Sequence, residues 1–138
     1  MIKIKEETKT FFTFDKSTLF AYLDSRKVCN KAYRSFLEKT PFGCLEENTF
    51  FVNGECYGVS HFLTVSKIDG FDIKKANQHL GLDKGNIMAI ALVEGDDVIC
   101  LDLVTGEVFL WMISCGDGEK ILISKTFDMF LDMIKIDA

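Results

Sequence analysis

The sequence Ile87-Met-Ala-Ile-Ala-Leu-Val93, Glu94-Gly-Asp-Asp97, Val98-Ile-Cys-Leu-Asp-Leu-Val104, Thr105-Gly106, Glu107-Val-Phe-Leu-Trp-Met-Ile113 decides the fold of this chain. It consists of three apolar runs separated by two short polar connections, each of which contains a glycine. Runs of this kind are typical of strands joined by hairpin turns. The stretch therefore predicts three consecutive antiparallel strands.

The lengths of the two connections predict how these strands pair. A two-residue turn at 105–106 places Cys100 opposite Trp111, and a four-residue loop at 94–97 places Cys100 opposite Ala91. One face then carries only apolar side chains, namely Met88, Ile90, Leu92, Ile99, Leu101, Leu103, Val108, Leu110 and Met112. The other face is mixed and carries Ala89, Ala91, Cys100, Asp102, Phe109 and Trp111, with Glu107 near the turn. A one-residue slip would mix the two faces, so the apolar face is the predicted core and the mixed face lies under a helix or meets a partner.

Four amphipathic helices are predicted outside these strands. Three of them are expected to follow the capping residues Asp15, Asp72 and Ser124. The fourth begins near Asn30 and ends before Pro41, because proline disfavours helical geometry in the residue before it. Their predicted buried stripes are Leu19, Phe20 and Leu23; Tyr33, Phe36 and Leu37; Ile73, Ala76 and Leu80; and Phe127, Phe130, Leu131 and Ile134.

A hairpin is predicted between the second and third helices. Its strands are 47–52 and 56–59, and they flank Asn53-Gly54, a pair that favours a tight turn because both residues tolerate positive φ. Residues 61–65 are predicted to form a further short extended segment. The whole pattern predicts a single α+β domain over 1–138, with a mainly antiparallel sheet flanked by helices and with 1–12 as a frayed end or an edge strand.

The composition limits the classes of function. The chain has 138 residues, 48% of them hydrophobic, a net charge of -5 and a pI near 5.0. A nucleic-acid-binding protein would need a basic surface, so direct nucleic-acid binding is not expected, and a basic protein partner is. The longest uninterrupted apolar run, Ile87–Val93, is too short to span a membrane. Five cysteines without CxxC spacing, and a start without a leader-like apolar run, predict a cytoplasmic protein with reduced thiols.

Catalytic and metal-binding patterns are weak in this sequence. Cys56 and His61 lie five residues apart on neighbouring extended segments and have no evident reason to meet, and His79 is placed to interact with a helix dipole. The glycines of 81–85 and 116–119 lack the residues of phosphate-binding and calcium-binding loops and are expected to form turns. We therefore expect no catalytic residues, no metal and no cofactor. An enzyme that uses Cys56, Cys100 or Cys115 remains a third alternative, which a thiol of depressed pKa would support.

The candidate partner-binding residues are acidic or aromatic. Glu94, Asp96 and Asp97 share one loop, Glu46 and Glu47 share another, and such charges steer association with a basic surface. Asp102, Glu107, Phe109 and Trp111 lie on the mixed face, where exposed aromatic side chains would be the natural anchors of an interface. Each feature also has a simpler explanation, a solvated turn for the carboxylates and core packing for the aromatics.

The order of these motifs resembles the SUKH superfamily, the Smi/Knr-like proteins of bacteria and fungi. The resemblance rests on the helix Tyr33-Arg-Ser-Phe36-Leu37, the strand Ile87-Met-Ala-Ile-Ala-Leu, the turn and strand Thr105-Gly106-Glu107-Val-Phe109-Leu-Trp111, and the closing Thr126-Phe127-Asp-Met-Phe130-Leu131, over about residues 15–135. The chain departs from the family pattern at Val28-Cys29-Asn30 and Thr40-Pro-Phe-Gly43, where Leu-Pro and Asn-Gly-Gly are common.

The resemblance implies a single α+β domain without catalytic residues. It also implies a cytoplasmic immunity protein that binds and neutralises a cognate secreted polymorphic toxin, such as a nuclease. Its partner would be that toxin domain, with a basic surface complementary to an acidic inhibitor. The alternative is a regulatory or scaffold domain of the same fold that binds a protein unrelated to toxins. The oligomeric state stays open.

Overall fold

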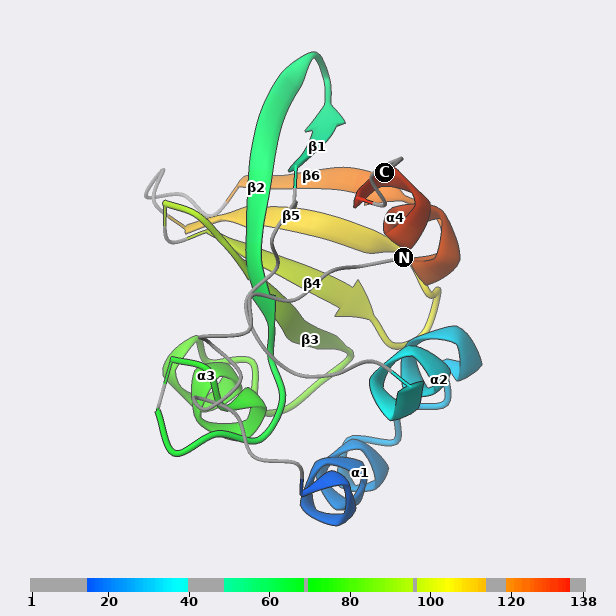
Figure 1. Ribbon diagram of the computed structural model, residues 1–138, viewed down its shortest axis with the longest axis vertical. Helices are drawn as coiled ribbons and strands as arrows, with labels where there is room; N and C mark the ends of the chain where they lie inside the picture. Colours follow the sequence, from blue (N-terminus) through cyan, green and yellow to red (C-terminus); the bar gives the residue numbers. More distant parts are fainter. Residues whose placement is uncertain (1–14, 40–48, 69, 96, 114–118, 135–138) are drawn as a thin grey trace.

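The computed structural model describes residues 15–39, 49–68, 70–95, 97–113 and 119–134. It confirms an α+β domain, built on a six-stranded antiparallel sheet in which each strand pairs with the next along the chain (Figure 1). The strands are β1 (Thr49–Val52), β2 (Glu55–Phe62), β3 (Ile87–Val93), β4 (Val98–Asp102), β5 (Val108–Met112) and β6 (Glu119–Ser124). The helices are α1 (Lys16–Ser25), α2 (Lys31–Lys39), α3 (Ile73–His79) and α4 (Phe127–Ile134). The predictions on 1–12, Pro41, Glu46, Glu47, Asp96, Cys44 and Cys115 lie outside the described residues.

Three helix starts follow the predicted chemistry, and one does not. The Asp15 carboxylate accepts a hydrogen bond from the Thr18 N–H at 3.0 Å, and the Asp72 carboxylate accepts one from the Lys75 N–H at 3.1 Å. The Asn30 side chain accepts from the Tyr33 N–H at 3.0 Å, which starts α2 as expected. The prediction of Ser124 as the cap of α4 is wrong, because Ser124 belongs to β6. Thr126 takes that role, and its hydroxyl accepts from the Met129 N–H at 3.2 Å.

Strand β6 replaces part of what was expected to be an irregular glycine-containing connection. It pairs antiparallel with β5, with Phe109 opposite Leu122 and Trp111 opposite Lys120. Its apolar run is short and its side chains are mostly exposed or half-buried, so the sequence gives little alternation to detect. The last third of the chain therefore contributes four strands, not three.

The predicted pairing of β3 with β4 is wrong, because the connecting loop is one residue longer than expected and a β-bulge adds one more residue to β3. Ala89 lies opposite Cys100 and Ala91 opposite Ile99, so Ile90 is the extra residue. Beyond the bulge the strand reverses its faces. Ala91 therefore joins the core face, and Leu92 moves to the mixed face, opposite Val98.

The predicted pairing of β4 with β5 is wrong by two residues. Cys100 lies opposite Phe109 and not opposite Trp111, because the connection is longer than the two residues at 105–106. The Asp102 carboxylate shapes this connection by accepting hydrogen bonds from the Val104 N–H at 2.9 Å and the Thr105 N–H at 3.1 Å. A two-residue shift preserves alternation, so Phe109 and Trp111 keep the predicted face.

The predicted Asn53-Gly54 turn is confirmed. Both residues have positive φ, 52° and 80°, and Val52 pairs with Glu55 across the turn. The returning strand β2 is longer than expected and includes the start of the segment predicted separately at 61–65. A register shift at Ser60 separates its two parts.

Aromatic side chains from α2, α4 and β2 form the centre of the core. Phe127 meets Tyr33 with ring centroids 5.2 Å apart, and Phe36 meets Phe62 at 4.6 Å. Phe130 meets Phe50 of β1 at 5.8 Å. Helix α4 thus contacts both β1 and β6, the first and last strands of the sheet, and nearly closes it (Figure 1). Among the described residues, no helix is long and apolar enough to cross a membrane.

Candidate protein-binding surface

The mixed face of the sheet carries a row of side chains across neighbouring strands. The pairings place His61, Leu92, Val98, Trp111 and Lys120 one after another from β2 to β6. The next row places Phe109 beside Leu122, which is 50% exposed. The Lys120 ammonium lies over the rings of Phe109 and Trp111, 5.6 and 5.9 Å from their centroids. This surface combines an apolar patch with one cation.

The candidate residues on this face differ in accessibility. Phe109 is 9% exposed and mainly packs in the core, whereas Trp111 is half-buried and keeps part of its ring accessible. Asp102 holds the β4–β5 connection, and the Glu107 carboxylate accepts a hydrogen bond from the Thr105 hydroxyl at 3.2 Å. The two carboxylates therefore have structural roles in the turn, and Trp111 is the more accessible of the two aromatic candidates on this face.

The acidic candidates of the β3–β4 connection separate into two environments. Glu94 is exposed, while Asp97 is only 7% exposed. The Val93 N–H donates to the Asp97 carbonyl at 2.8 Å, which closes the hairpin. Asp96 lies outside the described residues. Glu94 is thus the accessible carboxylate among the described residues of this connection.

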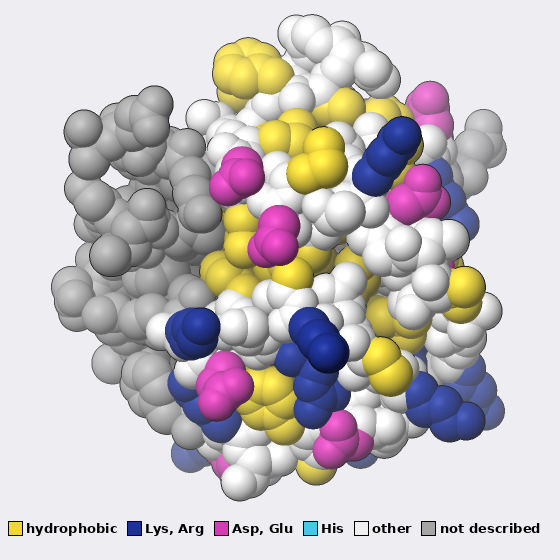
Figure 2. Space-filling model, turned by 90° about the vertical axis from the view of Figure 1, so that its right-hand side faces the viewer, with side chains coloured by type: hydrophobic (Ala, Val, Ile, Leu, Met, Phe, Trp, Pro, Cys, Tyr) yellow, Lys and Arg dark blue, Asp and Glu magenta, His cyan; other side chains and the backbone are white. Residues whose placement is uncertain are grey.

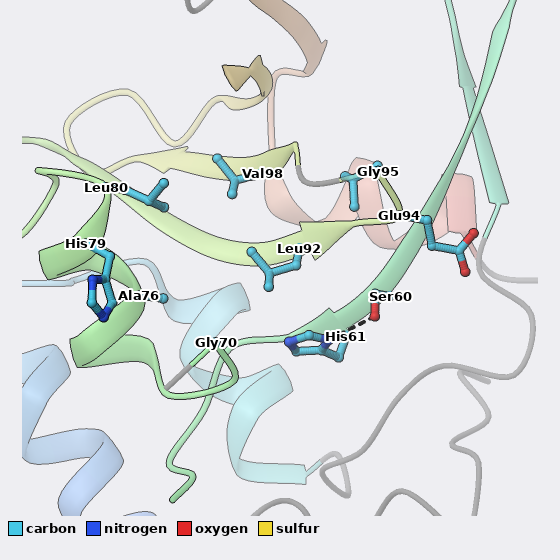
Figure 3. Close-up of a pocket in the computed structure, with 11 residues that line it drawn as sticks. Ser60, His61, Gly70, Ala76, His79, Leu80, Leu92, Glu94, Gly95 and Val98 are labelled. Atoms are coloured by element: carbon cyan, nitrogen blue, oxygen red, sulfur yellow. Dashed lines mark hydrogen bonds between the residues drawn. The ribbon is translucent and has the colours of Figure 1, made fainter. Parts of the chain in front are cut away.

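The structure also contains a hollow that the sequence did not indicate. It lies beside α3, between β2 and the β3–β4 hairpin, and has a volume of ≈ 360 Å³ (Figure 3). Leu80, Leu92 and Val98 supply apolar walls, and His79 stands across the hollow from His61 and Ser60. Four separate segments of the chain form it, and Leu92 reaches it only because of the β3 bulge. Sequence spacing therefore gave no signal for it.

The imidazole of His61 is buried next to this hollow. It is 2% exposed, its Nδ1 lies 2.9 Å from the Ser60 hydroxyl, and its ring contacts Phe71 at 4.3 Å. Burial lowers the pKa of His61 from 6.5 to about 4, because the charged form loses hydration. The imidazole is consequently neutral at physiological pH.

The low pKa of His61 predicts a pH-dependent stability. Between pH 6.5 and about 4 the unfolded chain binds a proton that the folded chain excludes, so stability falls as the pH falls through this window. The total loss is expected to be roughly 3 kcal/mol. Urea unfolding at pH 7.5, 6.0, 5.0 and 4.5 measures it, with His61→Gln as the matched variant. Equal pH slopes for the two proteins would contradict the assignment.

The thiols of the three described cysteines, Cys29, Cys56 and Cys100, offer little sign of nucleophilic chemistry. Cys100 is fully buried, and burial raises the pKa of its thiol to about 12. Cys29 and Cys56 are exposed, and no Cys–His pair joins Cys56 to the buried His61. Within the described ranges, no three His, Cys, Asp or Glu residues are grouped as metal ligands would be. What the described geometry offers is contact area: an apolar patch, a hollow and scattered carboxylates.

This arrangement is a small α+β domain with an accessible apolar patch and a hollow beside α3. The model of the SMI1 / KNR4 family (SUKH-1) matches residues 30–133, from the start of α2 into α4. The chain belongs to this family, whose members are generally immunity proteins against polymorphic toxins and typically non-catalytic. No curated protein and no solved structure gives a match.

Proposed function

We propose that this chain is a non-catalytic immunity protein that binds one cognate secreted toxin in the cytoplasm and neutralises it. The observation that carries the proposal is the family match over 30–133, which includes α2, the hairpins and most of α4. The surface agrees with a binding role, because it combines the half-buried Trp111 with the exposed Leu122 and a neighbouring hollow.

The charge of the chain favours a basic toxin, of the nuclease kind. A net charge of -5 attracts a protein with a positive cleft and accelerates their association. The candidate contact residues from the sequence are Glu94, Asp96, Asp97, Asp102, Glu107, Phe109 and Trp111. Because Asp97 and Phe109 are buried, we propose that the described part of the contact is made by Glu94, Asp102, Glu107 and Trp111. Of these, Trp111 is the expected anchor, since aromatic side chains dominate binding energy where an interface excludes water.

Replacing Trp111 by alanine is expected to weaken toxin binding roughly 10- to 30-fold, the usual loss for a hot-spot aromatic residue. Calorimetric titration with the toxin domain encoded by the adjacent gene measures the dissociation constant. Gln78→Ala is the matched control, because Gln78 is exposed on α3 and is not one of the proposed contact residues. Unchanged affinity in Trp111→Ala would remove Trp111 from the interface, and no binding by the unmodified chain would contradict the proposed function.

A further inference from the structure

We infer that the toxin contact extends across β6 onto the outer face of α4, and that this face takes a basic protein surface with a protruding apolar side chain. The outer face of α4 is defined by Asp128, Met129, Asp132 and Met133. The inference rests on the proposed function and names a surface that neither the family match nor the sequence patterns indicate.

The two sides of α4 have different environments. Its inner stripe is buried and consists of Phe127, Phe130, Leu131 and Ile134. On the outer face, Met129 is 52% exposed and Met133 is half-buried one turn further on. Packing in the core explains why the inner stripe is apolar. It does not explain why two methionines, one exposed and one half-buried, lie on the outer face.

The outer face combines two kinds of side chain that suit a basic, partly apolar partner. Methionine is flexible and polarisable, so it adapts its shape to an incoming apolar group. Asp128 and Asp132 are exposed and stand one turn apart, on the same side as the two methionines. A cationic side chain on the partner would meet these carboxylates while its apolar neighbour packs on the methionines.

The distribution of charge supports this orientation. Residues 15–39 and 72–84, which include α1 to α3, contain nine Lys and Arg and five Asp and Glu. The other described residues contain three Lys and eight Asp and Glu. In Figure 2, Lys and Arg side chains gather mainly in the lower half, at the height of α1 and α2, and acidic and hydrophobic side chains adjoin above them, at the height of α4. A basic partner is therefore favoured on the part of the domain outside α1 to α3, which includes α4, over α1 to α3 themselves.

Strand β6 links the Trp111 surface to α4, because Trp111 lies opposite Lys120 near the start of β6 and α4 follows the end of β6. Helix α4 follows β6 after a short connection and packs against it, and β6 also carries Lys120 and Leu122 on the mixed face. An interface of ordinary size buries about 800 Å² on each partner, which is enough to cover one strand and its flanks. One toxin domain can therefore contact both surfaces at once.

Methyl NMR with ¹³C-labelled methionine tests this inference on the full chain. The probes are Met129 and Met133 on the outer face, and Met88, which is fully buried in β3, is the internal reference. One equivalent of the toxin domain encoded by the adjacent gene is expected to shift the Met129 methyl signal and to protect it about fivefold or more from a soluble paramagnetic agent. An unshifted and unprotected Met129 in a formed complex would overturn the inference while leaving the proposed function intact.

Matched variants separate the charge from the apolar contact. Met129→Gln is expected to raise the dissociation constant about tenfold, and Asp128→Asn with Asp132→Asn to lower the association rate about fivefold at low salt, an effect that 0.5 M salt removes. Gln78→Ala and Asp83→Asn are the controls, since both residues are exposed, belong to α3 or the connection after it, and are not among the proposed contact residues. Equal effects in the controls would overturn the inference. A chain that binds no toxin at all would instead overturn the proposed function.

Discussion

Replacing Asn77 by leucine is expected to remove roughly 3–4 kcal/mol of folding stability. Asn77 is fully buried, and its side-chain amide takes the place of a missing strand beside β3. Its Nδ2 donates to the Ala89 carbonyl at 3.1 Å, and its Oδ1 accepts from the Ala89 N–H at 2.8 Å. Leucine fills a similar volume but leaves both buried backbone groups without partners, at about 1–3 kcal/mol each.

The position of Asn77 explains why this effect is large. Strand β2 pairs with β3 only as far as Phe62, which faces Ala91, and the Leu63 N–H then donates to the Ile90 carbonyl at 2.8 Å. Beyond that point, Asn77 of α3 makes the hydrogen bonds to the backbone of Ala89 in β3. The same Nδ2 also donates to the carbonyl of Ile73, four residues earlier in α3, at 2.8 Å.

Chemical unfolding in urea measures the change, with Gln78→Leu as the matched control on the same helix. Gln78 is exposed, so its replacement is expected to alter the free energy of unfolding by less than about 0.5 kcal/mol. If Asn77→Leu and Gln78→Leu unfold at the same urea concentration, Asn77 does not hold the edge of β3.

Replacing Phe127 by alanine is expected to cost about 3–5 kcal/mol, the usual loss for a buried phenylalanine. Phe127 is 1% exposed and is the ring that joins α4 to α2 and the sheet. Its centroid lies 5.2 Å from that of Tyr33, 5.4 Å from that of Phe36 and 6.3 Å from that of Phe62. Alanine would leave a cavity among three aromatic rings that cannot close without moving a helix.

Two further variants serve as comparisons for the stability loss of Phe127→Ala. Phe127→Leu keeps most of the apolar volume and is expected to lose less than half as much stability as Phe127→Ala. Met129→Ala lies on the same helix but at an exposed position, and is expected to leave the free energy of unfolding within about 0.5 kcal/mol. A small loss in Phe127→Ala would mean that α4 is not anchored through this ring.

Local chemistry made some parts of the fold predictable from sequence. Asp15 and Asp72 cap helices because their carboxylates reach N–H groups three residues ahead, and Asn53-Gly54 turns because both residues accept positive φ. Strand β6 was missed because its apolar run, Ile121-Leu122-Ile123, is short and shows no alternation of polar and apolar residues. The pairing of β3 with β4 was missed because a bulge at Ile90 depends on contacts between strands and leaves no periodic mark in the sequence.

The candidate surface was less predictable than the fold. The apolar face of the β-strands could be inferred from alternation, and alternation also placed Phe109 and Trp111 together on the other face. Alternation could not indicate that Asp97 is buried or that the Asp102 carboxylate accepts a hydrogen bond within its own turn. Nor could it indicate that the Lys120 ammonium lies over the rings of Phe109 and Trp111. Those properties arise from residues brought together by β6 and the turns, so only the three-dimensional arrangement reveals them.

Inhibition of the cognate toxin by the purified chain is the direct test of the proposed immunity function. The toxin domain encoded by the adjacent gene is held at a concentration well above the dissociation constant, and its activity is measured as the chain is added. We predict that activity falls linearly and reaches its minimum at one equivalent, as expected for tight stoichiometric binding without turnover. Toxin activity that is unchanged at a tenfold excess of the chain would contradict the proposal that this chain neutralises the toxin.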